Sequence, residues 1–302
     1  MSARHAVAAL VAAVTTLLTL PAAACPSCAC GVQNPTRLGA DVPFAGRARV
    51  ALVSTTATLR EDDMALIASD VSVAGSFAVT DFLVVEAALP LSSRFVIEPG
   101  PDVTGRAVGL GDARLGARAV VYRDRLLAPR LLVATRLQAV LPTAPGLKVR
   151  NVPVAMALQP GGGAVALNAS VALLARPTAR LLLGVDVSAQ TPLWTPHWTR
   201  DGASAGTSGQ LATSAQFDVT DVVAVRGMAS TQATHAPLAD HHGFRDGEAV
   251  SDRGSVYGGV GLSFTITPEI LAVVDVEVPV ATFGDPRAKD GARATAGVVY
   301  DF

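Results

Sequence analysis

The sequence is poor in charged residues, in aromatic residues and in cysteine. Charged residues make up 16% of the 302 residues and aromatic residues 5%, and the three cysteines lie in one cluster. Disordered chains are rich in charge and poor in apolar residues, so a chain that is 50% hydrophobic is expected to fold. The net charge of −1 indicates that the protein lacks the basic surface that binding to nucleic acid requires. Three clustered cysteines are too few for a disulfide framework.

Long apolar runs are also scarce. Residues 1–24 are expected to be a signal peptide, because a short apolar core, Ala6 to Leu20, precedes an A-x-A cleavage site. That core is shorter than the ~20 residues of a spanning helix. The longest charge-free segment, 151–175, contains prolines and three consecutive glycines, which break helices. An exported, apolar chain without spanning helices is either a large soluble β protein or an outer-membrane barrel.

A period of two in the hydrophobic pattern decides between these two classes. In 292–302 the even positions are mostly apolar and the odd positions mostly polar, and the same alternation runs through 270–280. Segments of 11 to 14 residues suit tilted membrane strands. Twelve segments follow the pattern: 46–60, 69–79, 82–94, 107–122, 130–142, 163–175, 179–191, 209–219, 222–233, 254–266, 270–282 and 292–302.

The connections between these segments alternate between short and long. Tight turns such as Thr80-Asp81 and Thr220-Asp221 alternate with longer polar stretches such as 192–208. Outer-membrane barrels have short periplasmic turns and longer outer loops. The sequence therefore predicts an all-β fold, a twelve-stranded antiparallel transmembrane β-barrel over residues 46–302, with both termini on the periplasmic side.

Several short motifs resemble one family. Gly109-Leu110-Gly111-Asp112, Leu141-Pro142-Thr143 and the segment 276–280 are similar to segments of the MetA-pathway phenol-degradation family of outer-membrane transporter-like proteins. The resemblance implies an outer-membrane pore for small molecules. The terminal Tyr300-Asp301-Phe302 resembles the signature that the barrel assembly machinery reads, which makes that machinery an expected partner through Phe302. The low aromatic content departs from the family and implies thin aromatic girdles.

Charged side chains gather on the polar side of the strands, which in a barrel is the lumen. At the membrane midplane an arginine facing lipid would cost about 2–4 kcal/mol. Such charges form a cross-lumen network that stiffens the barrel, an eyelet that selects solutes by charge, or both. The candidate lumen residues are Glu86, Asp112, Arg114, Arg118, Arg136, Arg180, Asp186, Arg226, Asp275, Glu277 and Arg293, with Arg47 and Arg49 on the same face.

A cysteine-bearing periplasmic segment, residues 25–45, precedes the barrel. Its Cys25, Cys28 and Cys30 form a C-x-x-C-x-C pattern. Three thiolates suit one soft metal ion such as Cu(I) or zinc; a disulfide and lipidation of Cys25 are the alternatives. The histidines His197, His235, His241 and His242 fall in predicted outer loops, where they are either solvated or capture a divalent ion.

The predicted function is a porin-like outer-membrane channel for passive passage of small solutes, with selectivity from the lumen charges. The alternative is a non-transporting barrel that acts as a scaffold or as a metal or redox sensor through its cysteine segment. An enzyme is not expected, because no nucleophile and base fall within reach of each other on a strand end. The expected partners are outer-membrane lipid, the assembly machinery and a small-molecule solute, in the cell envelope of a Gram-negative-type bacterium, and no resident cofactor is required.

Overall fold

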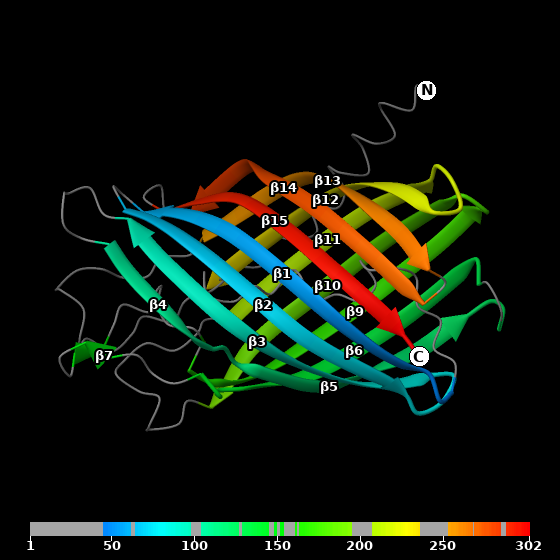
Figure 1. Ribbon diagram of the computed structural model, residues 1–302, viewed down its shortest axis with the longest axis horizontal. Helices are drawn as coiled ribbons and strands as arrows, with labels where there is room; N and C mark the ends of the chain where they lie inside the picture. Colours follow the sequence, from blue (N-terminus) through cyan, green and yellow to red (C-terminus); the bar gives the residue numbers. More distant parts are fainter. Residues whose placement is uncertain are drawn as a thin grey trace.

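The computed structural model describes residues 45–61, 64–97, 104–126, 129–144, 148–149, 152–153, 161, 163–194, 207–235, 253–267, 269–284 and 288–302. Figure 1 shows a barrel of tilted strands with the last strand beside the first. The strands are β1 (Ala48–Glu61), β2 (Met64–Ala78), β3 (Leu83–Ile97), β4 (Thr104–Leu110), β5 (Ala113–Arg123), β6 (Leu131–Leu141), β7 (Lys148–Val149), β8 (Val152–Pro153), β9 (Val165–Thr178), β10 (Leu181–Trp194), β11 (Thr207–Asp218), β12 (Val223–His235), β13 (Arg253–Thr267), β14 (Ile270–Gly284) and β15 (Ala288–Asp301).

The main sheet closes on itself. Each strand pairs antiparallel with its neighbour in the order β2-β1-β15-β14-β13-β12-β11-β10-β9-β6-β5-β3, and β2 also pairs with β3. The first and last strands meet over a register that runs from Arg49↔Asp301 to Glu61↔Ala288. Because β4 and β5 both pair with β3 and together form one bent strand, the wall has twelve strands, and the predicted fold is confirmed.

The predicted strand 107–122 is broken at Gly111 and Asp112. Leu110 pairs with Leu91 and Arg114 pairs with Ala88, so four steps along this strand face three steps along β3. One extra residue of this kind is a β-bulge, which bends the strand. The bulge reverses the alternation: Val108 and Leu110 are exposed on the outside before it, and Leu115 is exposed on the outside after it.

Some of the loops predicted to be long are short. Strand β1 extends to Glu61 and β2 begins at Met64, so the connection predicted at 61–68 is reduced to 62–63. Strand β14 extends to Gly284 and β15 begins at Ala288, so the connection predicted at 283–291 is reduced to 285–287. The polar residues there continue the strands beyond the apolar stretch. The remaining connections at this end, including 195–206 and 236–252, stay longer than the turns at the other end. We call the two ends the loop end and the turn end.

The tight turns share one hydrogen-bonding pattern. The hydroxyl of Thr80 accepts from the backbone N–H groups of Phe82 and Leu83 at 3.1 and 3.0 Å. The hydroxyl of Thr220 accepts from Val222 and Val223 at 3.3 and 3.0 Å in the same way. Threonine hydroxyls stabilise turns by this side-chain-to-backbone contact. The shared polar turn that the sequence predicted is therefore present.

The two faces of the wall differ as the alternation predicted. Large apolar side chains such as Leu52, Val73, Leu137 and Val274 are exposed on the outside. Near the turn end, apolar side chains also pack on the inside, in two clusters: Ala51, Val53, Val273 and Val299, and Val120, Leu132, Ala134 and Leu174. Among the described residues no helix is long and apolar enough to span a membrane. A closed barrel with an apolar outer band is a structure that can lie in lipid.

Candidate functional site

The inner wall carries a charged cluster around Glu86. Its carboxylate lies 3.3 Å from Arg118 Nε and 3.0 Å from Arg136 Nε, and it accepts a hydrogen bond from Gln138 Nε2 at 3.2 Å. All four residues are buried, so the charges are held in a medium of low dielectric constant, where pairing is needed to offset desolvation. Arg114 and Asp186 are half-buried close by.

A second charged cluster surrounds Asp275. Arg226 Nη2 donates to both carboxylate oxygens of Asp275, at 2.6 and 2.7 Å. The carboxylate of Glu277, two residues along the same strand, accepts from the Ser230 hydroxyl at 3.3 Å. Arg293 Nη2 donates to Gln232 Oε1 at 2.6 Å. The acidic and basic groups of this part of the lumen are thus fixed by their neighbours.

Glycines on the intervening strands let these polar side chains meet. Gly116 of β5 lies in register between Glu86 and Gln138. Gly261 of β13 lies in the same way between Arg226 and Asp275. A Cβ at Gly261 would collide with the Asp275 carboxylate, and one at Gly116 would collide with the chain at Gln138. Each glycine therefore opens the space in which partners from two strands away make contact.

Two further polar groups lie in the lumen beside the predicted residues. Arg94 is 1% exposed and its Nη1 donates to Asp70 Oδ1 at 2.8 Å. Tyr257 is also 1% exposed, and the Arg293 guanidinium lies 3.9 Å from the centre of its ring. Arg94 lies an even number of residues from Glu86 on the same strand, so the alternation predicts that its side chain also points inward. The neighbouring serines made the alternation hard to follow there.

Uncharged polar side chains form a third feature of the inner wall. Gln138, Asn168, Gln190 and Ser208 are cross-strand partners from β6 to β11, and all four are buried. A small cavity opens beside them, with Gln210 and Gln232 in its lining. Within the described residues Gln210 Nε2 is buried without a hydrogen-bond partner. We call this row of four residues the amide belt.

Two predicted lumen residues lie away from these clusters. Arg180 is exposed in the turn before β10, and its carbonyl oxygen accepts from the Asp218 N–H at 2.9 Å. Asp112 is buried at the bulge between β4 and β5, where Oδ1 accepts from the Ala144 N–H at 3.3 Å. Arg180 therefore lies at the rim of the turn end, and Asp112 lies at the bend between β4 and β5, which its hydrogen bond helps to hold.

The two charged clusters lie on opposite walls. Four strands separate β6 from β13, and four separate β5 from β14 in the other direction. The wall around Glu86 has one more cation than anions, with Arg114, Arg118 and Arg136 against Glu86 and Asp186. Asp290 of β15 accepts a hydrogen bond from the Ser255 hydroxyl at 2.5 Å on the wall around Asp275. That wall has one more anion than cations, with Asp275, Glu277 and Asp290 against Arg226 and Arg293. Within these two sets of residues, the two walls therefore carry excess charge of opposite sign.

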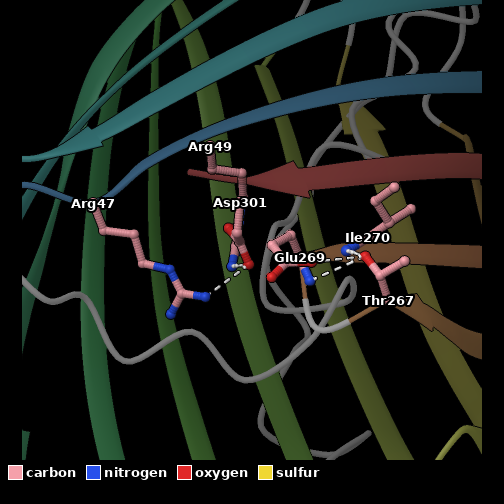
Figure 2. A network of polar contacts seen from close by, with 6 residues as sticks. All are labelled: Arg47, Arg49, Thr267, Glu269, Ile270 and Asp301. Atoms are coloured by element: carbon pink, nitrogen blue, oxygen red, sulfur yellow. Dashed lines mark hydrogen bonds and ion pairs between the residues drawn. The ribbon is translucent and has the colours of Figure 1, made fainter.

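Where the barrel closes, ion pairs between side chains also hold the last strand (Figure 2). Arg47 Nη2 donates to Asp301 Oδ2 at 3.0 Å, and Arg49 donates to both oxygens of the same carboxylate, at 2.5 and 2.8 Å. The backbone N–H of Phe302 donates to the Ala48 carbonyl oxygen at 2.9 Å. The terminal residues predicted to be read during assembly thus form the closing contact of the barrel.

The predicted soft-metal ligands Cys25, Cys28 and Cys30 lie outside the described residues, as do His197, His241 and His242. His235 is exposed at the end of β12. Over the part of the chain that the structure describes, no three His, Cys, Asp or Glu side chains come together in a way that would hold a metal ion.

The barrel matches solved outer-membrane proteins. An outer membrane channel from Pseudomonas putida F1 superposes with a TM-score of 0.65 at 15% identity, over 89% of this chain and 99% of that chain. The β domain of the Bordetella autotransporter BrkA gives a TM-score of 0.53 at 13% identity, over 85% and 100% of the two chains. The transport unit of the Escherichia coli autotransporter AIDA-I gives 0.51 at 12% identity, over 85% and 90%.

These likenesses show the fold. The protein is a twelve-stranded β-barrel of the outer-membrane type. No family model and no curated protein matches the sequence.

Proposed function

We propose that the protein is a channel through which small solutes cross the outer membrane passively. The observation that carries the proposal is the polar inner wall, where the charged clusters on opposite sides and the amide belt between them run through a barrel that lies in lipid. Interiors of this kind are typical of barrels with an aqueous lumen. The structure that is similar at a TM-score of 0.65 is of an outer membrane channel, which supports the same function.

The lumen charges define the proposed selectivity. Since one excess charge on each wall cancels the other, we expect weak discrimination between anions and cations. The excess charges of opposite sign on the Glu86 wall and the Asp275 wall favour solutes with a dipole, which orient between them. The buried, paired state of the charges points to a narrow path and therefore to small solutes. The family resemblance makes small phenols one class to test.

Single-channel recording in planar lipid bilayers tests the proposal. The purified, folded barrel should give discrete conductance steps and a reversal potential near zero in a salt gradient. Liposome swelling with neutral solutes of increasing size then measures the width of the path. A folded barrel that conducts no ions and admits no solute would contradict the channel function and favour the scaffold or sensor alternative.

A further inference from the structure

Four arginines line one half of the turn-end mouth of the lumen. They belong to the neighbouring strands β5, β6, β9 and β10 or lie just before them: Arg123, Arg130, Arg176 and Arg180. Arg130, Arg176 and Arg180 are each two residues from a leucine that packs in the apolar cluster inside the lumen. Side chains two residues apart on a strand share a face, and Arg123 pairs directly with Leu132 of that cluster. All four arginines therefore face the lumen, and we call them the mouth arginines.

The mouth arginines have few acidic neighbours. The Arg176 N–H donates to the Arg130 carbonyl oxygen at 2.7 Å, so these two arginines lie opposite each other on adjacent strands. Like charges in this arrangement repel each other. Asp218 lies opposite Arg180, since its N–H donates to the Arg180 carbonyl oxygen at 2.9 Å, and its carboxylate accepts from Gln216 Nε2 at 3.2 Å. Over the described residues, no ion pair joins a mouth arginine to a carboxylate.

Two other carboxylates of the same strands do not neutralise this charge. Arg136, the partner of Glu86, is six residues from Arg130 along the strand, which is roughly 20 Å at about 3.3 Å per residue. The apolar cluster lies between these two levels of the lumen. The Asp124 N–H donates to the Leu131 carbonyl oxygen, and Leu131 is exposed on the outside, so Asp124 has the outward face. Among the described residues, the positive charge at the mouth therefore exceeds the negative charge that faces it.

Arg123 is held in place while its donors stay unused. Its guanidinium carbon lies 4.5 Å from the centre of the Phe82 ring, and this cation–π contact fixes the end of the side chain. Both of its Nη atoms are buried and have no hydrogen-bond partner within the described residues. A buried donor without a partner is costly, and an anionic oxygen is the acceptor that guanidinium donors bind most strongly. The mouth thus has a preorganised donor group as well as a surplus of positive charge.

We propose that the mouth arginines bind a small solute with two negative charges on oxygen, such as a phosphate monoester or a dicarboxylate. The planar guanidinium group donates two parallel hydrogen bonds to phosphate or carboxylate oxygens. An anion between Arg130 and Arg176 replaces the repulsion within this pair by two attractive contacts. With Asp218 set against Arg180, three positive charges remain, so a dianion is favoured over a monoanion.

Isothermal titration calorimetry of the whole folded barrel in a non-ionic detergent tests the proposal. Inorganic phosphate and succinate are the probes, at a pH at which both are mainly dianions, and acetate at the same ionic strength is the monoanion. We expect one site per barrel, with dianion binding about ten-fold tighter than acetate binding. Arg130→Gln and Arg176→Gln should each weaken phosphate binding by about ten-fold, because each removes a charge-assisted contact. Arg130 is exposed, so its variant serves if Arg176→Gln does not fold.

Arg47→Gln is the matched control, because it removes an arginine from the same mouth but outside these four strands. Arg47 is already bound to Asp301 at 3.0 Å, so its loss should leave phosphate binding within about two-fold of the wild type. The proposal would be overturned if neither dianion bound more tightly than acetate, or if the arginine variants bound phosphate like the wild type. An equal loss in Arg47→Gln would also overturn it, since the net charge of the mouth would then account for binding. Calorimetry reports binding alone, so the outcome does not depend on whether the barrel conducts.

Discussion

Removal of one partner of the Arg226–Asp275 pair should destabilise the barrel strongly, whereas replacement of both should not. The two side chains are 5% and 9% exposed and meet at 2.6 Å. Their charge centres are about 4 Å apart, and at an effective dielectric constant of about 20 this gives an attraction of about 4 kcal/mol. A single substitution also leaves a buried charge without its partner, and such changes cost about 3–5 kcal/mol.

A double-mutant cycle separates these effects. Arg226→Met and Asp275→Leu should each lower the free energy of unfolding by about 3–5 kcal/mol. The double variant should lie within about 2 kcal/mol of the wild type, because an apolar pair of similar volume replaces an ion pair at little cost. Gly261 leaves space beside position 275, so the leucine side chain has room on the wall. The measurement is urea unfolding in lipid vesicles, followed by tryptophan fluorescence.

The control is an exposed ion pair on the same barrel. Arg125 and Asp124 lie 3.8 Å apart with 57% and 26% of their side chains exposed. Arg125→Met should leave the unfolding curve unchanged, since solvent screens such pairs. The reasoning about buried pairs would be refuted if the double variant lost as much stability as the two single variants together. In the same barrels, Arg226→Met should shift the reversal potential towards cation selectivity, because Asp275 then lacks its arginine partner.

Three other outcomes are expected. Val274 is exposed on the outside, so Val274→Arg should cost about 2–4 kcal/mol near the midplane and reduce the heat-modifiable folded band on gels, while a normal band would reverse the assignment of faces. Hydrogen bonds from the Leu131 and Arg130 N–H groups lower the pKa of Asp124. The turn is therefore fully stabilised above the ordinary aspartate pKa of about 3.9 and loses this stabilisation as the pH falls through the lowered value. Amide exchange at Leu131 should become faster over that pH range in the wild type but not in the Asp124→Asn variant. The mature protein should bind about one Cu(I) or zinc ion through Cys25, Cys28 and Cys30, and metal analysis of the triple serine variant should show none; a disulfide without metal would contradict this.

Most of the wall could be predicted from the sequence because membrane strands obey two strict rules. Side chains alternate between lipid and lumen, and tight turns need polar residues that satisfy the backbone. The residues around Val274 and those around Thr220 follow these rules without exception, and the structure has the expected strand and turn at both places. Rules of this kind can be recognised in a single sequence because they involve only residues that are close together along the chain.

The positions that the sequence left open depend on residues far away. At the bulge at Gly111 and Asp112, the Asp112 carboxylate accepts a hydrogen bond from the N–H of Ala144, which lies beyond the next strand. The short loops at 62–63 and 285–287 arise because polar residues continue the ladder between β1 and its two neighbours, where pairing rather than hydrophobicity sets the end of the strand.

The pairing of the lumen charges depends on both the alternation along each strand and the register between strands. Parity along each strand predicts that Arg226, Asp275 and Glu277 point inward, but partners are set by register across an intervening strand. That strand, β13, carries Gly261 opposite Arg226 and Asp275, and Gly259 opposite Glu277. In β5, Gly116 has the same place between Glu86 and Gln138. An inward glycine between two strands with long polar side chains is therefore a signal of a bridge across the glycine. Gly261→Ala tests it directly, because the added methyl group meets the Asp275 carboxylate and should cost a large part of what Arg226→Met costs, whereas Gly227→Ala on β12, where a Cβ meets nothing within 4 Å, should cost little.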